Sequence, residues 1–159
     1  MLPYFESVSH DECCAYCTGR RLADPLPYPL DAIYCISLQE QPHRTREAEA
    51  HFHSLGMCRH VTFYRPRRGE NGERAIWESH QALARHALAN GRSHALMLED
   101  DVFFRQPWKQ LAPRIGRAIT ALPPDWWCFY LGHVPLQAHF FRSNILRVRS
   151  GCALSLIHI

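Results

Sequence analysis

The chain has 159 residues, of which 47% are hydrophobic and 21% are charged, and its 18 basic and 15 acidic side chains give a formal net charge of +3. This balance predicts one globular domain, or part of a larger one, and argues against a nucleic-acid-binding protein. The first residues lack the basic and apolar regions of a signal peptide, and no run approaches the ~18 apolar residues of a transmembrane segment. We therefore expect a cytoplasmic protein without a transmembrane segment.

Residues 1–30 show no hydrophobic period and predict an irregular leader that carries four prolines. Within this leader the string "HDECCAYC" offers four possible zinc ligands, namely His10, Cys13, Cys14 and Cys17. A zinc site needs a second ligand pair at a suitable spacing, and none follows. A locally packed or disordered segment is therefore favoured over a metal site.

A regular pattern of apolar runs begins at residue 31. Short runs rich in β-branched and aromatic residues predict strands, and longer segments with a helical stripe predict helices that end at Gly56 and Gly91. The predicted strands are 31–38, 60–65, 94–103, 126–133 and 144–148, and the predicted helices are 43–56, 73–91 and 108–122. This alternation predicts an α/β fold with a mainly parallel sheet flanked by helices, whose ligand site lies beyond the carboxyl ends of the strands.

Three consecutive carboxylates, Glu99, Asp100 and Asp101, end the apolar run of the predicted strand 94–103. Their mutual repulsion and desolvation are costly unless a cation lies nearby. Alternation along a strand would place Glu99 and Asp101 on one side and Asp100 on the other, so that the pair could share Mn²⁺ or Mg²⁺. The alternative is a turn with solvated acidic residues, but the apolar flanks favour the metal site.

Four motifs carry a resemblance to a known family. They are "ISLQEQPHR" at 36–44, Ser79 and His80 within a long helix, "LEDD" at 98–101, and "YLG" at 130–132. In this order and spacing they resemble glycosyltransferase family 25, which holds bacterial lipopolysaccharide galactosyl- and glucosyltransferases and collagen hydroxylysine galactosyltransferases. The first motif departs from the family pattern, because Ser37 and His43 replace its usual Asn and Asp.

The resemblance covers residues 31–153 and implies a GT-A-like (Rossmann-like) domain that binds a nucleotide-sugar donor. It further implies an inverting hexosyltransferase that uses UDP-galactose or UDP-glucose, Mn²⁺ or Mg²⁺, and a glycan or protein hydroxyl as acceptor. Asp101 and Glu99 are the expected metal ligands, and Asp100 the expected contact to the donor's ribose or sugar. The catalytic base is not identified.

The remaining candidates concern donor binding. Ser79 and His80 match the family's Ser-His pair, which implies that they contact the donor. For His80, a histidine in the core that is hydrogen-bonded to the backbone is an equally good interpretation. Arg44 begins the first predicted helix and could bind phosphate there, or could be an exposed helix charge. The arginines of the loop 65–72 (Arg65, Arg67 and Arg68) are interpreted as solvated surface rather than a diphosphate clamp.

The last six residues, "LSLIHI" at 154–159, read as the translation of a transposase sequencing adapter. We therefore expect the natural domain to continue past about Ala153 and this chain to hold only part of it; a native apolar strand is the alternative. Two other functions stay open: a non-catalytic sugar- or partner-binding module of the same fold, and a Mg²⁺-dependent phosphoryl or nucleotidyl transferase.

Overall fold

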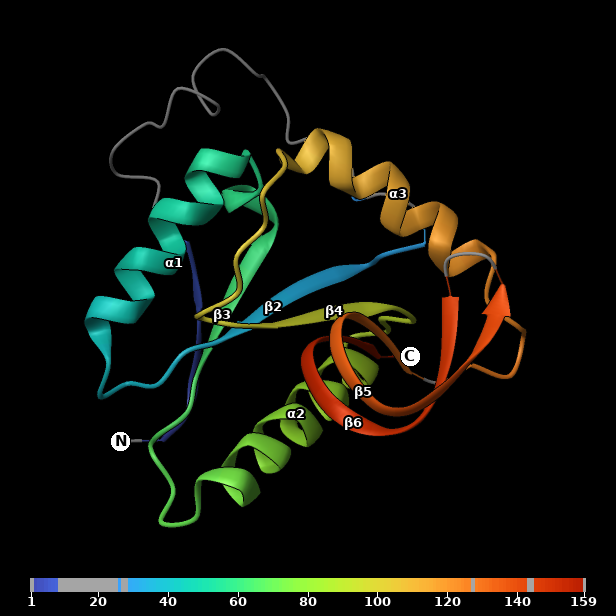
Figure 1. Ribbon diagram of the computed structural model, residues 1–159. Coiled ribbons are helices and arrows are strands. Elements are labelled where there is room, and N and C mark those ends of the chain that lie inside the picture. Colours follow the sequence, from blue (N-terminus) through green and yellow to red (C-terminus); the bar gives the residue numbers. More distant parts are fainter. Residues whose placement is uncertain (1, 9–25, 27–28, 127, 143–144, 159) are drawn as a thin grey trace.

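The computed structural model describes residues 2–8, 26, 29–126, 128–142 and 145–158. Within these ranges the chain alternates strands and helices as the sequence predicts (Figure 1). The strands are β1 (Tyr4–Ser7), β2 (Ala32–Ile36), β3 (Val61–Arg65), β4 (Ala95–Glu99), β5 (Cys128–Arg142) and β6 (Ile145–His158). The α helices are α1 (Pro42–Leu55), α2 (Gly72–Ala89) and α3 (Trp108–Thr120), and a 3₁₀ turn, Cys58–His60, precedes β3. The fold class is α/β.

The strands form one mixed sheet in the order β1-β3-β2-β4-β6-β5. The central strands β3, β2 and β4 are parallel, because α1 and α2 each provide a crossover between them. The outer pairings β1–β3, β4–β6 and β5–β6 are antiparallel. The prediction of a mainly parallel sheet is therefore confirmed for the central three strands and wrong for the outer ones.

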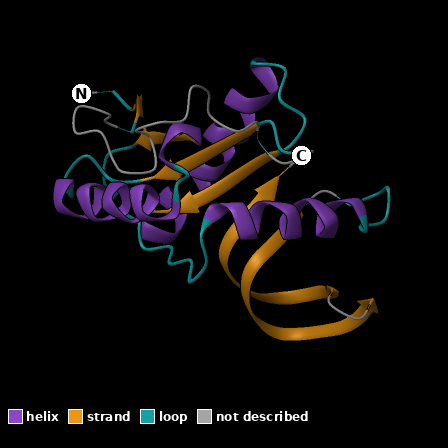
Figure 2. Cartoon of the chain, turned by 90° about the horizontal axis from the view of Figure 1, so that it is seen from above, coloured by secondary structure: helices purple, strands orange, loops and turns teal. Residues whose placement is uncertain are grey.

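Helices cover both faces of the parallel strands (Figures 1 and 2). On one face, α1 and α3 pack against inward residues such as Ile33, Phe63 and Leu98. On the other face, α2 packs Leu83 and Ala87 against the alternate strand residues. Residues of β2 and β4 are buried on both faces, which explains why their sequences are continuous apolar runs rather than alternating ones.

Two segments differ from the sequence prediction. β1 lies inside the leader 1–30 and pairs with the edge of β3, and the ring of Phe5 stacks on that of His86 at a centroid distance of 3.9 Å. Its four residues are all exposed, so they leave no hydrophobic pattern to detect. β5 and β6 form a long antiparallel hairpin instead of two short strands, because only two residues separate them and a parallel connection needs a dozen or more.

Residues 156–158 of β6 pair with β4; the adapter origin of 154–159 stays a prediction. The proposed ligands at 10–17 lie outside the described residues.

Helix α2 is the longest helix described and shows how the local sequence sets its ends. Asn71 is the N-cap, and its side chain accepts a hydrogen bond from the backbone N–H of Arg74 (3.0 Å). After the C-cap Asn90, Gly91 adopts φ +68°, a conformation that favours glycine. In the part of the chain that the structure describes, neither α2 nor another helix combines the length and apolar character needed to cross a membrane.

Candidate functional site

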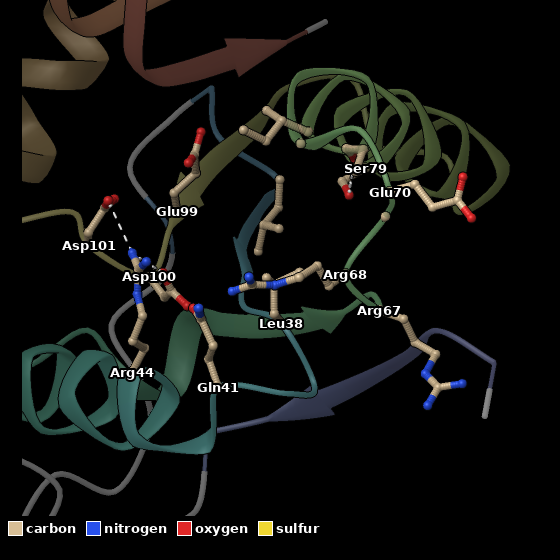
Figure 3. Close-up of a pocket in the computed structure, with 15 residues that line it drawn as sticks. Leu38, Gln41, Arg44, Arg67, Arg68, Glu70, Ser79, Glu99, Asp100 and Asp101 are labelled. Carbon is tan, nitrogen blue, oxygen red and sulfur yellow. Dashed lines mark hydrogen bonds and ion pairs between the residues drawn. The ribbon is translucent and has the colours of Figure 1, made fainter.

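A pocket of about 400 Å³ opens at the carboxyl ends of the parallel strands (Figure 3). After β2 the chain turns to α1 on one face of the sheet, and after the adjacent β3 it turns to α2 on the other face. Such a switch point is where α/β sheets bind ligands. The polar and charged lining residues are Gln41, Arg44, Arg67, Arg68, Glu70, Ser79, Glu99, Asp100 and Asp101.

The three carboxylates lie at the end of β4, where the strand stops earlier than predicted. β4 ends at Glu99, and the backbone N–H of Val102 donates to the Glu99 carbonyl (3.0 Å), which closes a turn. Strand alternation therefore does not extend to Asp100 and Asp101, and all three carboxylates line the same pocket. Asp100 and Asp101 both contact Arg44 of α1, whereas Glu99 lies nearest His80 of α2. That Glu99 and Asp101 face one side and together hold a metal ion stays a prediction.

Arg44 supplies the cation that this acidic turn requires. Its Nη2 atom lies 2.5 Å from Oδ1 of Asp100 and 3.1 Å from Oδ2 of Asp101 (Figure 3). An arginine in the first turn of a helix is disfavoured by the helix dipole, and these two ion pairs offset that cost. Asp100 and Asp101 thus converge on one positive centre.

Asp100 is the most buried of the three carboxylates, with 8% of its side chain exposed, against 67% for Asp101. Burial raises the pKa of Asp100, while the hydrogen bond from Ser37 and the charge of Arg44 lower it and the two neighbouring carboxylates raise it. The Ser37 hydroxyl donates to Oδ2 of Asp100 (2.8 Å). Ser37, which departs from the family pattern, therefore has a defined role in this chain.

A buried arginine, Arg65, contacts the serine that donates a hydrogen bond to Asp100. Arg65, the last residue of β3, is only 4% exposed, and its Nη1 donates to the hydroxyls of Ser37 (2.9 Å) and Thr45. The interpretation of Arg65 as solvated surface is therefore wrong, because these two buried hydroxyls accept its hydrogen bonds. The network links β3, the end of β2 and α1 to Asp100.

The Ser-His pair of α2 lies beside the pocket. Ser79 lines it, but the hydroxyl donates to the Ala75 carbonyl within the helix (2.8 Å). His80 is not part of the lining; its Nε2 lies 3.8 Å from Oε1 of Glu99. These contacts place the N-terminal half of α2 toward the carboxyl end of β4.

The carboxylates of the acidic turn have the oxygen atoms that a hard divalent cation takes as ligands, and Arg44 contacts two of them in this structure. Asp100 and Asp101 already share one cationic partner, and Mn²⁺ and Mg²⁺ take carboxylate oxygens together with water and substrate phosphates. Among the described residues, His, Cys, Asp and Glu side chains do not form a group of three or more that could hold a metal ion. A bound ion would therefore depend on water or a ligand to complete its coordination.

The loop after the acidic turn is held by His51 of α1. Nε2 of His51 accepts a hydrogen bond from the backbone N–H of Phe104 (3.0 Å), and its ring stacks on that of Phe103 at a centroid distance of 4.8 Å. A protonated imidazole cannot accept this bond. Burial lowers the pKa of His51 from its ordinary value of 6.5. The neutral form of His51 therefore stabilises the loop.

This contact predicts a loss of stability in acid. The unfolded chain protonates His51 at higher pH than the folded protein, so the contribution is lost as the pH falls below about 6.5 and through the folded pKa. Between about pH 7.5 and 5.5, we expect the melting temperature of the wild type to fall by ~2–4 °C more than that of His51→Gln. His43→Gln, on the exposed side of the same helix, should behave as the wild type. Equal acid losses in wild type and His51→Gln would contradict the prediction.

Four polar or charged lining residues were not predicted to belong to a site. Gln41 and Glu70 were not considered, and Arg67 and Arg68 were interpreted as solvated surface. Gln41 is at the N-cap position of α1, without a capping hydrogen bond from its side chain, and Arg68 lies in the loop after β3. Both follow the carboxyl end of a parallel strand, and that position is the sequence signal that could have found them.

Comparisons with family models, curated proteins and solved structures found no match. The resemblance to glycosyltransferase family 25 thus stays a prediction that rests on its motifs, and the function has to be argued from the pocket.

Proposed function

We propose that this chain is the nucleotide-sugar-binding part of a metal-dependent glycosyltransferase of the family 25 type, with a GT-A-like fold. It would transfer galactose or glucose from a UDP-sugar to a hydroxyl of a glycan or protein, with inversion. The observation that carries this proposal is the pocket at the switch point of the sheet, in which Asp100 and Asp101 converge on one cationic centre. Its volume falls within the range of small-molecule sites.

The lining residues would have different roles in such a site. Asp101 is the proposed principal metal ligand, with Glu99 and Asp100 as the neighbouring carboxylates. Arg44, released from Asp100 and Asp101 by an incoming ion, would be free to contact phosphate at the start of α1. When bound, the metal supplies positive charge that stabilises the departing diphosphate.

The direct test is calorimetric titration of UDP into the whole chain, with Mn²⁺ and with a chelator. We expect Mn²⁺ to tighten UDP binding tenfold or more. Asp101→Asn should remove this gain, because even residues that only support the ligands of a metal ion typically cost 10–100-fold in metal affinity when they are mutated. Glu70→Gln is the matched control: Glu70 also lines the pocket, but its carboxylate points away from Asp100 and Asp101 (Figure 3). This control should keep the Mn²⁺ effect within about twofold, the scale of a surface substitution. UDP binding that does not depend on Mn²⁺ would count against the proposal.

A non-catalytic binding module is the second candidate, and Arg44 favours it. Because the guanidinium already neutralises Asp100 and Asp101, the acidic turn is stable without a metal. Mn²⁺-dependent UDP binding without release of hexose from UDP-galactose or UDP-glucose, in a chain that includes the acceptor half, would favour this candidate. Release of phosphate without a glycoside would instead favour a phosphoryl transferase.

A further inference from the structure

The loop that closes one side of the pocket, residues 66–71, is fixed to its neighbours by backbone contacts. The backbone N–H of Gln39 donates to the Pro66 carbonyl (3.0 Å), and the backbone N–H of Arg68 donates to Oε2 of Glu40 (3.1 Å). Gly69 packs so closely on α2 that a Cβ at this position would lie 2.8 Å from that of Ala75. The loop therefore presents its side chains from a defined backbone.

The arginines of the pocket differ in what they contact. Arg44 is paired with Asp100 and Asp101, and Arg67 has its Nε 3.5 Å from Oε1 of Glu40. In Figure 3 the Arg67 side chain points away from the pocket, whereas that of Arg68 extends into it above Leu38. Within the described part of the chain, the guanidinium of Arg68 has neither an ion pair nor a hydrogen bond. The N–H groups of the Arg68 guanidinium are thus available to donate hydrogen bonds to a ligand.

The surroundings of Arg68 favour an anion. Gly72, Ala75 and Ile76 bring the first turns of α2 to the same pocket, and the amino end of a helix attracts negative charge. Glu99, Asp100 and Asp101 enter the pocket from the turn after β4, whereas Arg68 extends into it from the loop after β3, and Glu70 of that loop points away from the acidic turn (Figure 3). A ligand held by both segments would need an anionic group for Arg68 and a cation for the acidic turn. Phosphate matches the guanidinium fork, which can bind two of its oxygens at once.

We propose that Arg68 is the diphosphate-recognising side chain of this pocket and sets its preference for phosphorylated ligands. The inference deepens the proposed function, on which its choice of a nucleoside diphosphate rests. The recognised chemistry is the diphosphate itself, whether free or part of a nucleotide. Arg68 holds this group from the loop after β3 while the acidic turn after β4 holds the accompanying cation.

The test compares Arg68→Gln with Arg67→Gln, two adjacent exposed positions at which the same charge is removed. UDP, uridine and inorganic diphosphate are titrated calorimetrically in the presence of Mn²⁺, and thermal melting verifies that both variants are folded. We expect Arg68→Gln to weaken the binding of UDP and of diphosphate at least tenfold, because about two charge-assisted hydrogen bonds would be lost. The binding of uridine should not change. Arg67→Gln should remain within about twofold of the wild type, as expected for an exposed side chain.

The outcomes separate this inference from the proposed function. If UDP binding is Mn²⁺-dependent and lost in Asp101→Asn but unchanged in Arg68→Gln, the role of Arg68 is overturned and the proposed function stands. If the wild type binds diphosphate through Arg68 but binds UDP no more tightly, the nucleotide function fails and the role of Arg68 stands. Equal losses in the Arg67 and Arg68 variants, or a wild type that binds neither UDP nor diphosphate, would overturn the inference.

Discussion

Replacing Phe63 with alanine should lower the free energy of unfolding by about 3–5 kcal/mol, the range for truncating a buried phenylalanine. Phe63 is fully buried on β3, its ring lies 6.0 Å from that of Phe52 on α1, and its backbone pairs with both β1 and β2. The cavity would open between the sheet and α1, where the surrounding strands have little freedom to collapse. Because domains have total stabilities of only about 5–15 kcal/mol, this loss is a large fraction.

Urea denaturation followed by circular dichroism measures this loss as a shift of the midpoint at an unchanged slope. Phe103→Ala is the matched control, because Phe103 is 73% exposed and loses only its stacking contact with His51. The control should cost less than about 1 kcal/mol, as expected for a surface contact. Similar losses in the two variants would show that the core does not lie between β3 and α1.

Replacing Arg65 with alanine should cost about 2–4 kcal/mol, because its hydrogen bonds to Ser37 and Thr45 are charge-assisted and buried. The ion pair with Glu6 contributes little, since the two groups are 3.8 Å apart and half of the Glu6 side chain is exposed. Loss of Arg65 would also free Ser37, the hydrogen-bond donor to Asp100. We therefore expect weaker Mn²⁺-dependent UDP binding together with lower stability.

The same urea titration tests this second prediction. Arg67→Ala removes the same charge from an exposed neighbour and should change stability by no more than about 0.5 kcal/mol. Arg65→Met keeps the apolar part of the side chain and separates packing from hydrogen bonding. If Arg65→Met were as stable as the wild type, the hydrogen bonds of Arg65 would not contribute net stability.

The parallel part of the fold could be predicted from sequence because its signals are local. The apolar runs of β2 and β4 and the stop at Gly91 each reflect the environment of a few consecutive residues. β1 left no such signal, because its four residues are all exposed and its position depends on pairing with β3 and on ring contacts of Phe5 with distant residues. The antiparallel position of β6 between β4 and β5 depends on pairing between distant segments, which periodicity does not encode.

The candidate site was predictable in composition but not in its contacts. The position of Glu99, Asp100 and Asp101 after a buried strand predicted that they line a pocket. That Arg44 reaches both Asp100 and Asp101 depends on the tertiary arrangement of α1 beside the end of β4, across more than fifty residues of sequence. The burial of Arg65 depends in the same way on Ser37 and Thr45, whose hydroxyls come from other elements.

The position of Arg44 has a consequence for how this chain folds. The acidic turn has an internal counterion, so the carboxylates can be brought together during folding before any ligand is present. In small metal-dependent domains the ion is part of the folding free energy, and its removal unfolds the chain. Because Arg44 neutralises the acidic turn from within the chain, the sheet can form with an empty pocket, and a chelator is expected to leave the chain folded.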